Sequence, residues 1–320
     1  MRMALCILAA LPALAAVDGT VINRTTGKPT AGAMVTLYKM GEGGMAPIET
    51  VRSDGEGRFR VAKDEPGAKL LQVIFDGVVY SHMLTPGTPT SGIGVDVYSA
   101  SKEPGAARIE QHMILLEPSG AQLLISEAYV FRNDGKTTFN NPDNGTLRFW
   151  MPEAAKGIVQ VNATAPGGMP VQRTAAKTAQ AGVYKVDFPI KPGETRIDLR
   201  YLVPFTENGT YEGKVLHAGV TKLVTPSGVT LQGRNVQAAG AEPQTKANIY
   251  DLKGTAFQVA VQGSGSLQAS TPATQEEEAA GPEIERVLPK LWDRAPLILG
   301  LAFGVLALGF ALLYRARPPA

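Results

Sequence analysis

The sequence predicts an all-β protein, with two tandem β-sandwich domains followed by a disordered linker and one C-terminal transmembrane helix. The 320-residue chain contains 35 glycines and 23 prolines. Short β-branched runs alternate with Asp-Gly and Asn-Gly dipeptides, which favour hairpins because both central residues must tolerate positive φ. Strands at about ten-residue spacing, without sustained helical periodicity before the linker, are typical of β-sandwiches.

The first 16 residues have the pattern of a secretory signal peptide. Arg2 supplies a positive start, and Met3–Leu14 is an apolar run broken only by Pro12. Small residues at Ala13 and Ala15 predict cleavage after Ala15 or Ala16. An uncleaved anchor is the alternative, but the run is shorter than the about 20 apolar residues that span a bilayer.

The first domain is predicted over residues 17–118. Its clearest hairpin joins Leu71–Phe75 to Val78–Met83 through Asp76-Gly77, with apolar residues on both arms. The strands expected in this domain are Gly19–Asn23, Met34–Lys39, Ile48–Arg52, Arg58–Ala62, Lys69–Phe75, Val78–Met83, Gly94–Tyr98 and Ile109–Glu117.

The second domain is predicted over residues 119–263, after a short joint at residues 117–120. A Pro-Gly turn followed by the alternating run Arg196–Pro204 is similar to part of a fibronectin- or immunoglobulin-like sandwich. The strands expected here are Gln122–Arg132, Thr146–Trp150, Ile158–Ala165, Val183–Pro189, Thr195–Val203, Val220–Thr225, Val229–Gly233 and Phe257–Gln262.

Four segments of the first domain, Gly19–Val21, Thr26–Pro29, Gly32–Leu37 and Ser53–Val61, resemble the carboxypeptidase regulatory-like family. In the last of them, a tight turn should deliver Phe59 to the interior. The resemblance implies a prealbumin-like (transthyretin-like) β-sandwich that serves as a non-catalytic module. It does not imply peptidase activity, because none of the three histidines begins the His-x-x-Glu motif that a zinc carboxypeptidase needs.

The C-terminal region predicts a membrane anchor. Residues 264–294 read as a flexible linker and juxtamembrane segment, because their composition cannot bury a core. Ala295–Tyr314 contains no charge and is long enough to span the hydrocarbon core, which leaves residues 315–320 as a cytoplasmic tail. Gly300 and Gly304 allow close helix approach, so homodimerisation or docking to a partner helix through the span is a hypothesis.

Composition bears on location and partners. The formal net charge is +2, which gives no electrostatic argument for nucleic-acid binding. The single cysteine, Cys6, lies in the signal peptide, so the mature protein would lack disulfides. We expect a bacterial inner-membrane protein with extracytoplasmic domains, although four N-glycosylation triplets, at Asn23, Asn144, Asn162 and Asn208, point the other way.

Few residues suggest a site. We expect no catalytic residues, no cofactor and no metal site, since His82 and His112 sit on apolar strands without convergent partners. The oxygen-rich segment Asn140–Gly145 could contact calcium, but a plain turn is the preferred interpretation. Trp150 is the one tryptophan before the linker. Its ring either packs in the core or presents an exposed face to a sugar.

The sequence therefore favours a non-catalytic binding or scaffolding protein that contacts another envelope protein. Binding of a carbohydrate or cell-wall polymer through a β-sandwich face is the alternative, and an enzyme of unrecognised type is the third. A protein partner and a carbohydrate both fit tandem β-sandwiches, because the fold does not determine the ligand.

Overall fold

The computed structural model describes residues 17–41, 44–206 and 208–267. The chain divides into two units, Met1–Ala269 and Ser270–Ala320, and all the described residues belong to the first. The expected signal peptide, most of the linker, and the expected span with Gly300 and Gly304 lie outside the described residues. Within the part that is described, no helix is long and apolar enough to cross a membrane.

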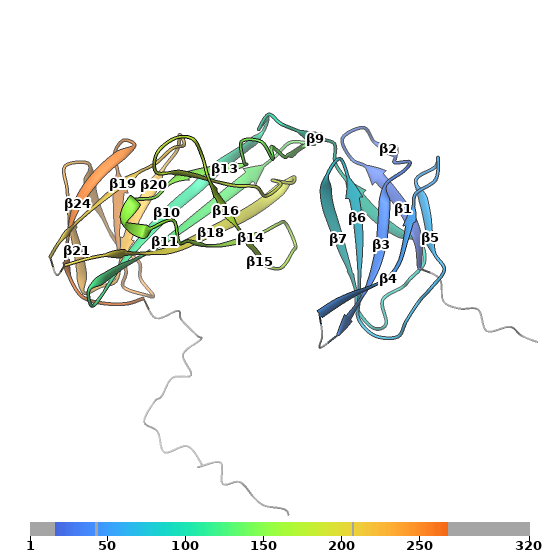
Figure 1. Cartoon of the computed structure of the whole chain (residues 1–320), viewed down its shortest axis with the longest axis horizontal. Helices are drawn as coiled ribbons and strands as arrows, with labels where there is room; N and C mark the ends of the chain where they lie inside the picture. The colour runs from blue at the N-terminus through green and yellow to red at the C-terminus, as the bar shows by residue number, and fades with distance from the viewer. Residues whose placement is uncertain (1–16, 42–43, 207, 268–320) are drawn as a thin grey trace, which may run out of the picture. The chain divides into compact units, whose positions relative to one another are not determined.

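The described residues form an all-β fold of several sheets, which is compatible with β-sandwich architecture (Figure 1). Its hydrophobic residues separate into two clusters. One cluster lies within residues 17–101, which we call the N-terminal module, and the other lies within residues 107–267, which we call the C-terminal module.

The N-terminal module has two sheets. In one, β1 pairs antiparallel with β2 and β5 and parallel with β8, and in the other the strand order is β4-β3-β6-β7. The strands are β1 (Val17–Asn23), β2 (Lys28–Pro29), β3 (Met34–Gly41), β4 (Gly44–Arg52), β5 (Arg58–Val61), β6 (Lys69–Phe75), β7 (Val78–Leu84) and β8 (Ile93–Val97). The short β9 (Ala100–Ser101) follows them and pairs in parallel with β12 (Thr138–Phe139).

The expected hairpin between β6 and β7 is confirmed. Phe75 pairs with Val78 across the turn, and Asp76 and Gly77 have φ of 47° and 73°. Positive φ at both central residues matches the twist of the strands, and it explains the Asp-Gly dipeptide. On β6, Leu71 and Val73 are buried in the module's core, as the alternating pattern predicts.

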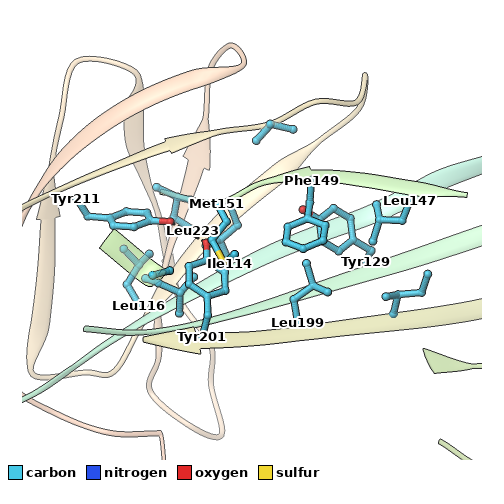
Figure 2. Packing of buried hydrophobic residues seen from close by; sticks show 14 of the residues in the cluster. Ile114, Leu116, Tyr129, Leu147, Phe149, Met151, Leu199, Tyr201, Tyr211 and Leu223 are labelled. Atoms are coloured by element: carbon cyan, nitrogen blue, oxygen red, sulfur yellow. Dashed lines mark hydrogen bonds between the residues drawn. The ribbon is translucent and has the colours of Figure 1, made fainter. Parts of the chain in front are cut away.

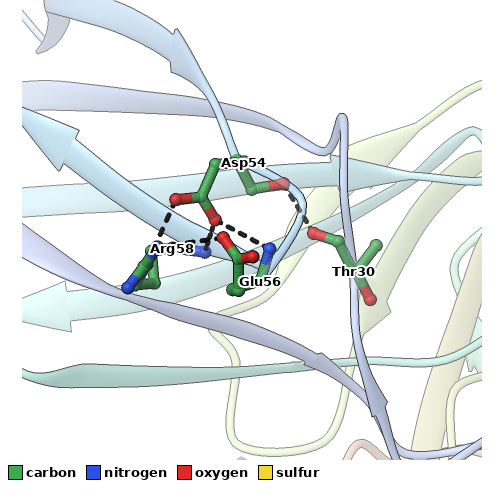
Figure 3. Close-up of polar contacts among 5 residues, drawn as sticks. Thr30, Asp54, Glu56 and Arg58 are labelled. Carbon is green, nitrogen blue, oxygen red and sulfur yellow. Dashed lines mark hydrogen bonds and ion pairs between the residues drawn. The ribbon is translucent and has the colours of Figure 1, made fainter.

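The tight turn expected before Phe59 is also present (Figure 3). The Asp54 carboxylate accepts hydrogen bonds from the backbone N–H of Glu56 at 3.0 Å and of Arg58 at 2.8 Å. Gly57 has φ 73°, and a Cβ there would lie 2.6 Å from a backbone oxygen of β1. Only glycine fits this position, and Phe59 emerges from the turn 4% exposed.

The C-terminal module contains one eight-stranded sheet, in the order β15-β14-β18-β11-β10-β20-β23-β22, and two three-stranded sheets, β13-β17-β16 and β19-β24-β21. Its strands, besides β12, are β10 (Ala107–Ser119), β11 (Gln122–Asn133), β13 (Leu147–Trp150), β14 (Gln160–Thr164), β15 (Val171–Arg173), β16 (Ala175–Lys177), β17 (Val183–Val186), β18 (Gly193–Pro204), β19 (Thr210–Lys214), β20 (Thr221–Thr225), β21 (Val229–Gln232), β22 (Val236–Ala241), β23 (Asn248–Leu252) and β24 (Ala256–Gly263). A 3-10 turn, η1, covers Glu153–Ala155.

The domain boundary expected between residues 118 and 119 is wrong. β10, which the sequence placed in the first domain, pairs with β11 along its whole length, from Ala107↔Asn133 to Ser119↔Gln122. Residues 117–120 therefore end one arm of a long hairpin and begin its turn. Ile114 and Leu116 of β10 are buried in the core of the C-terminal module, so the connection between the modules precedes Ala107.

Long alternating strands build the core of the C-terminal module. Side chains from β10, β11, β13 and β18 meet there, as Figure 2 shows. Phe149 is 1% exposed, and its ring centroid lies 5.8 Å from that of Tyr184. The same interior holds Tyr129, Tyr201 and Tyr211, whose hydroxyl groups need polar partners once they leave water.

Candidate functional site

A buried polar cluster lies inside the C-terminal module. We call it the Glu127 cluster, and it consists of Glu127, His112, Tyr129, Tyr201, Tyr211 and His217. Its members come from β10, β11, β18, β19 and the segment before β20. On β11, Glu127 and Tyr129 are two residues apart and so face the same side of the sheet, while His112 pairs directly with Tyr129 from β10.

The Glu127 carboxylate accepts three hydrogen bonds. Tyr129 Oη donates to Oε2 at 2.5 Å, His112 Nε2 donates to Oε2 at 3.1 Å, and Tyr201 Oη donates to Oε1 at 2.7 Å. Tyr211 Oη lies 3.0 Å from Tyr201 Oη and donates to it, because the Tyr201 proton is already engaged. The carboxylate is therefore satisfied entirely by protein groups, as a buried charge requires.

Hydrogen bonds also position the two histidines. His217 Nδ1 is 2.9 Å from the carbonyl of Ala218, which can only accept, so this nitrogen donates. His217 Nε2 is then free to accept from His112 Nδ1 at 3.0 Å. His112 Nδ1 also lies 3.2 Å from Thr221 Oγ1, and His112 Nε2 faces the Glu127 carboxylate, so both ring nitrogens of His112 have buried polar partners and His112 and Glu127 form a buried pair.

The ionisation states agree with this assignment. Burial raises the pKa of Glu127, but the hydrogen bond and positive charge of His112, with the tyrosine hydroxyls, outweigh it and hold the pKa below its usual range. Burial, reinforced by the charge of Glu127, raises the pKa of Tyr129 and Tyr201 well above 10. The tyrosines therefore remain donors and Glu127 remains a carboxylate.

This arrangement stabilises the core and leaves little room for acid–base chemistry. Glu127 is 5% exposed and already accepts from three donors, so a substrate has no access to the carboxylate. The His112 ring stacks on Tyr129 with centroids 3.9 Å apart, which closes its face. Only His217 is part-exposed, and burial lowers its pKa.

Trp150 lies at the end of β13 and is half-buried. The Lys214 ammonium lies over its ring, 5.4 Å from the centroid. Gly182 approaches so closely that a Cβ there would lie 2.6 Å from the indole nitrogen. The ring is thus packed against its own module, and a sugar would have to displace Lys214 to stack on that face.

The other residues considered from the sequence lie apart from one another. His82 is exposed on β7 in the N-terminal module, whereas His112 is buried in the Glu127 cluster. In the segment Asn140–Gly145, the Asp143 carboxylate binds the Lys102 ammonium at 2.7 Å. Among the residues that the structure describes, no group of three or more His, Cys, Asp or Glu side chains could hold a metal ion.

A surface groove of about 380 Å³ lies against β11, β14 and β18 in the eight-stranded sheet of the C-terminal module. We call it the apolar groove, and it is lined by Gln122, Leu124, Ala154, Ala155, Lys156, Ile158, Gln160, Arg200, Tyr201, Leu202, Val203 and Pro204. Ile158 is 73% exposed and Leu202 is 46% exposed. The pairing of β14 with β18 ends at Gln160↔Arg200. Beyond this point η1, instead of a strand, contacts β18, and the groove lies at this change.

Comparison with known proteins does not assign a family. No family model matches the chain, and no curated protein matches it. A solved structure of a mutant M1 zinc metallopeptidase from Deinococcus radiodurans aligns with 48% of this chain and 42% of its own, at 11% identity and a TM-score of 0.26. At that score the likeness carries no functional argument.

Proposed function

We propose that the chain is a non-catalytic binding protein that holds a partner protein in the apolar groove of the C-terminal module. The observation that carries this proposal is the exposure of both Ile158 and Leu202 in one concave, largely apolar surface. Scattered exposed apolar residues are ordinary, but a contiguous patch in a depression is typical of an interaction site.

The energetics favour occupation of the groove. Burying a large aliphatic side chain contributes about 1.5–3 kcal/mol when it is fully removed from water. Ile158 and Leu202 are far from fully buried in the free protein, so a partner that covers both would recover a substantial part of that free energy. Leu124 is half-buried in the same groove and extends the apolar floor.

The charges around the groove define the occupant. Lys156 and Arg200 line it, and none of its lining residues is acidic. Both cations are exposed, so a carboxylate on the partner could reach them without first being desolvated. We therefore commit to one occupant, a segment of another protein that carries apolar side chains next to an aspartate or glutamate.

The place of action is proposed from the sequence alone. An apolar N-terminal run and an uncharged apolar segment at Ala295–Tyr314 support a single-pass protein with both modules outside the cytoplasmic membrane of a bacterium. Such a protein would present the apolar groove to other envelope proteins. We do not propose the carbohydrate alternative, because Lys214 and Gly182 pack against the Trp150 ring that would have supported it.

A displayed peptide library tests the proposal directly. Random 12-residue peptides are selected on the full-length chain in detergent, and enriched sequences are measured against the wild type and an Ile158→Ser/Leu202→Ser variant. Enriched peptides should combine apolar and acidic residues, and the double change should weaken their binding at least tenfold. A Lys156→Gln/Arg200→Gln variant should weaken acidic peptides more than their amide analogues.

The matched control is Val220→Ser, since Val220 is 65% exposed but does not line the groove. Peptides that bind Val220→Ser and the wild type equally well would support the assignment. If no peptide is enriched, or if enriched peptides bind the Ile158→Ser/Leu202→Ser variant as tightly as the wild type, the groove is not the binding surface.

A further inference from the structure

A second pocket of the C-terminal module has an unusual concentration of positive charge. It has a volume of about 390 Å³ and lies beside the sheet β13-β17-β16. We call it the basic pocket, and it is lined by Asp143, Asn144, Arg148, Lys177, Thr178, Ala179, Gln180 and Lys185. Three cations and one carboxylate thus line it, on a chain whose formal net charge is only +2.

The strand register brings two of the cations together. Arg148 on β13 lies directly opposite Lys185 on β17, which places their Cβ atoms about 4.5–5.5 Å apart on one face of the sheet. Like charges in such a pair destabilise a sheet. Lys177, the last residue of β16, adds a third cation from the neighbouring strand.

These cations form no close ion pairs, although the charge of Lys185 contributes to the lowered pKa of Asp143. In the described part of the chain, no carboxylate oxygen lies within 4.0 Å of the charged nitrogens of Arg148, Lys177 or Lys185, and the carboxylate of Asp143 is paired with Lys102 at 2.7 Å. The contacts of Arg148 and Lys185 are instead with neutral oxygens. Arg148 donates to Gln180 Oε1 at 3.2 Å, and Lys185 Nζ donates to the Asp143 carbonyl at 2.5 Å.

The backbone holds this arrangement in place. Lys185 Nζ also donates to the Pro142 carbonyl at 3.0 Å, so the loop before β13 fixes the ammonium group. The loop can approach because residue 145 is glycine, with φ 74°. A Cβ there would lie 2.8 Å from Lys185 Cβ and 2.9 Å from a backbone oxygen of β17. The carbonyls of Pro142 and Asp143, in the segment considered for calcium, therefore accept hydrogen bonds from Lys185. The positive charge of the pocket favours anions.

We propose that the basic pocket binds a phosphoryl group. A guanidinium and two ammonium groups around one depression match the charge and the several acceptor oxygens of a phosphate, which arginine can engage with two parallel N–H donors. The pocket does not overlap the apolar groove, so this assignment does not depend on the proposed function. The phosphoryl group could belong to a soluble phosphate or to the diester headgroup of a lipid.

Calorimetric titration of the full-length chain in detergent tests the proposal. The two probes are inorganic phosphate and glycerophosphoglycerol, the deacylated headgroup of phosphatidylglycerol, each at low ionic strength. At least one probe should bind, and Arg148→Gln/Lys177→Gln should weaken that binding at least tenfold. Added sodium chloride should weaken it too, because Arg148 and Lys177 are exposed to solvent.

The control is Arg60→Gln/Lys63→Gln, which removes the same charge from two exposed residues of the N-terminal module. Preference for inorganic phosphate would identify a soluble phosphate ligand, and preference for the diester would identify a headgroup. Both outcomes support the site if the control variant binds like the wild type. Absence of binding by both probes, or equal weakening in the two double variants, would overturn it.

Discussion

The Glu127 cluster allows a quantitative prediction. In Glu127→Gln the side chain keeps its shape but loses its charge, so the buried pair with His112 is broken and the tyrosine hydroxyls lose a charged acceptor. Removing one member of a buried ion pair costs about 3–5 kcal/mol. For a module of this size, each kcal/mol shifts Tm by about 2–4 °C, so we expect a loss of roughly 6–20 °C.

Differential scanning calorimetry of the purified chain measures this effect as a shift of the transition of the C-terminal module. Glu110→Gln is the control, because Glu110 is exposed on β10 and its change should stay within about 0.5 kcal/mol. Combining Glu127→Leu with His112→Leu should cost less than the sum of the two single changes, since no charge is then left unpaired. A Glu127→Gln shift as small as that of Glu110→Gln would refute the buried ion pair.

Three further predictions concern pH, the turn before β5 and the core. The pKa of His217 is lowered below 6.5 in the folded state, so stability present above pH 6.5 is lost as the pH falls through the folded pKa. Denaturation curves recorded across this pH range should show a shallower decline of stability for His217→Gln than for the wild type. Gly57→Ala should lower the free energy of unfolding, measured by urea titration, by about 2 kcal/mol or more. The control Gly27→Ala should cost less, because φ at Gly27 is also 73° but no atom lies within 4 Å of the added Cβ. Phe149→Ala should cost about 3–5 kcal/mol in the same assay, because the ring is 1% exposed; a loss below about 1 kcal/mol would contradict the packing described.

Local features of the fold were predictable because their causes are local. The hairpin at Asp76-Gly77 and the turn that buries Phe59 depend on dipeptides that tolerate positive φ and on side chains that cap the turn. The long strand β18 follows from alternation of polar and apolar residues, and β10 and β11 follow from long runs rich in apolar and β-branched residues. The strands that were not expected are short, rich in polar residues or, in β22, composed mainly of alanine and glycine: β2, β9, β12, β15, β16, β19, β22 and β23.

The domain boundary was misplaced for a related reason. The Pro118-Ser119-Gly120 sequence looks like a joint between domains, but it forms the end of a hairpin whose arms both lie in the C-terminal module. Whether such a turn separates or connects two strands depends on the strands beyond it. Here β20 pairs with β10 from more than 100 residues away, and local sequence carries no sign of that contact.

The Glu127 cluster left one local sign. Along β11, Leu123, Ile125, Tyr129 and Phe131 occupy the core-facing positions, and Glu127 falls in the same phase. A charged residue at a core position predicts buried partners, although not which ones. The contact of His217 with the cluster could not be predicted from the sequence, because His217 meets His112 only in the folded chain. The apolar groove and the basic pocket could not be predicted either, because each combines residues from strands that become neighbours only after folding.

The cluster leads us to expect an order of folding events. The β10–β11 hairpin places His112 beside Glu127 early, since closing a short loop costs little entropy. Tyr201, 74 positions beyond Glu127, and His217, 105 positions beyond His112, arrive only when these later parts of the chain have docked. Until then the Glu127 carboxylate remains hydrated, because the core that buries it has not yet formed. We therefore expect the dehydration of this charge to accompany the docking of residues 201–217, which lie in the second half of the C-terminal module.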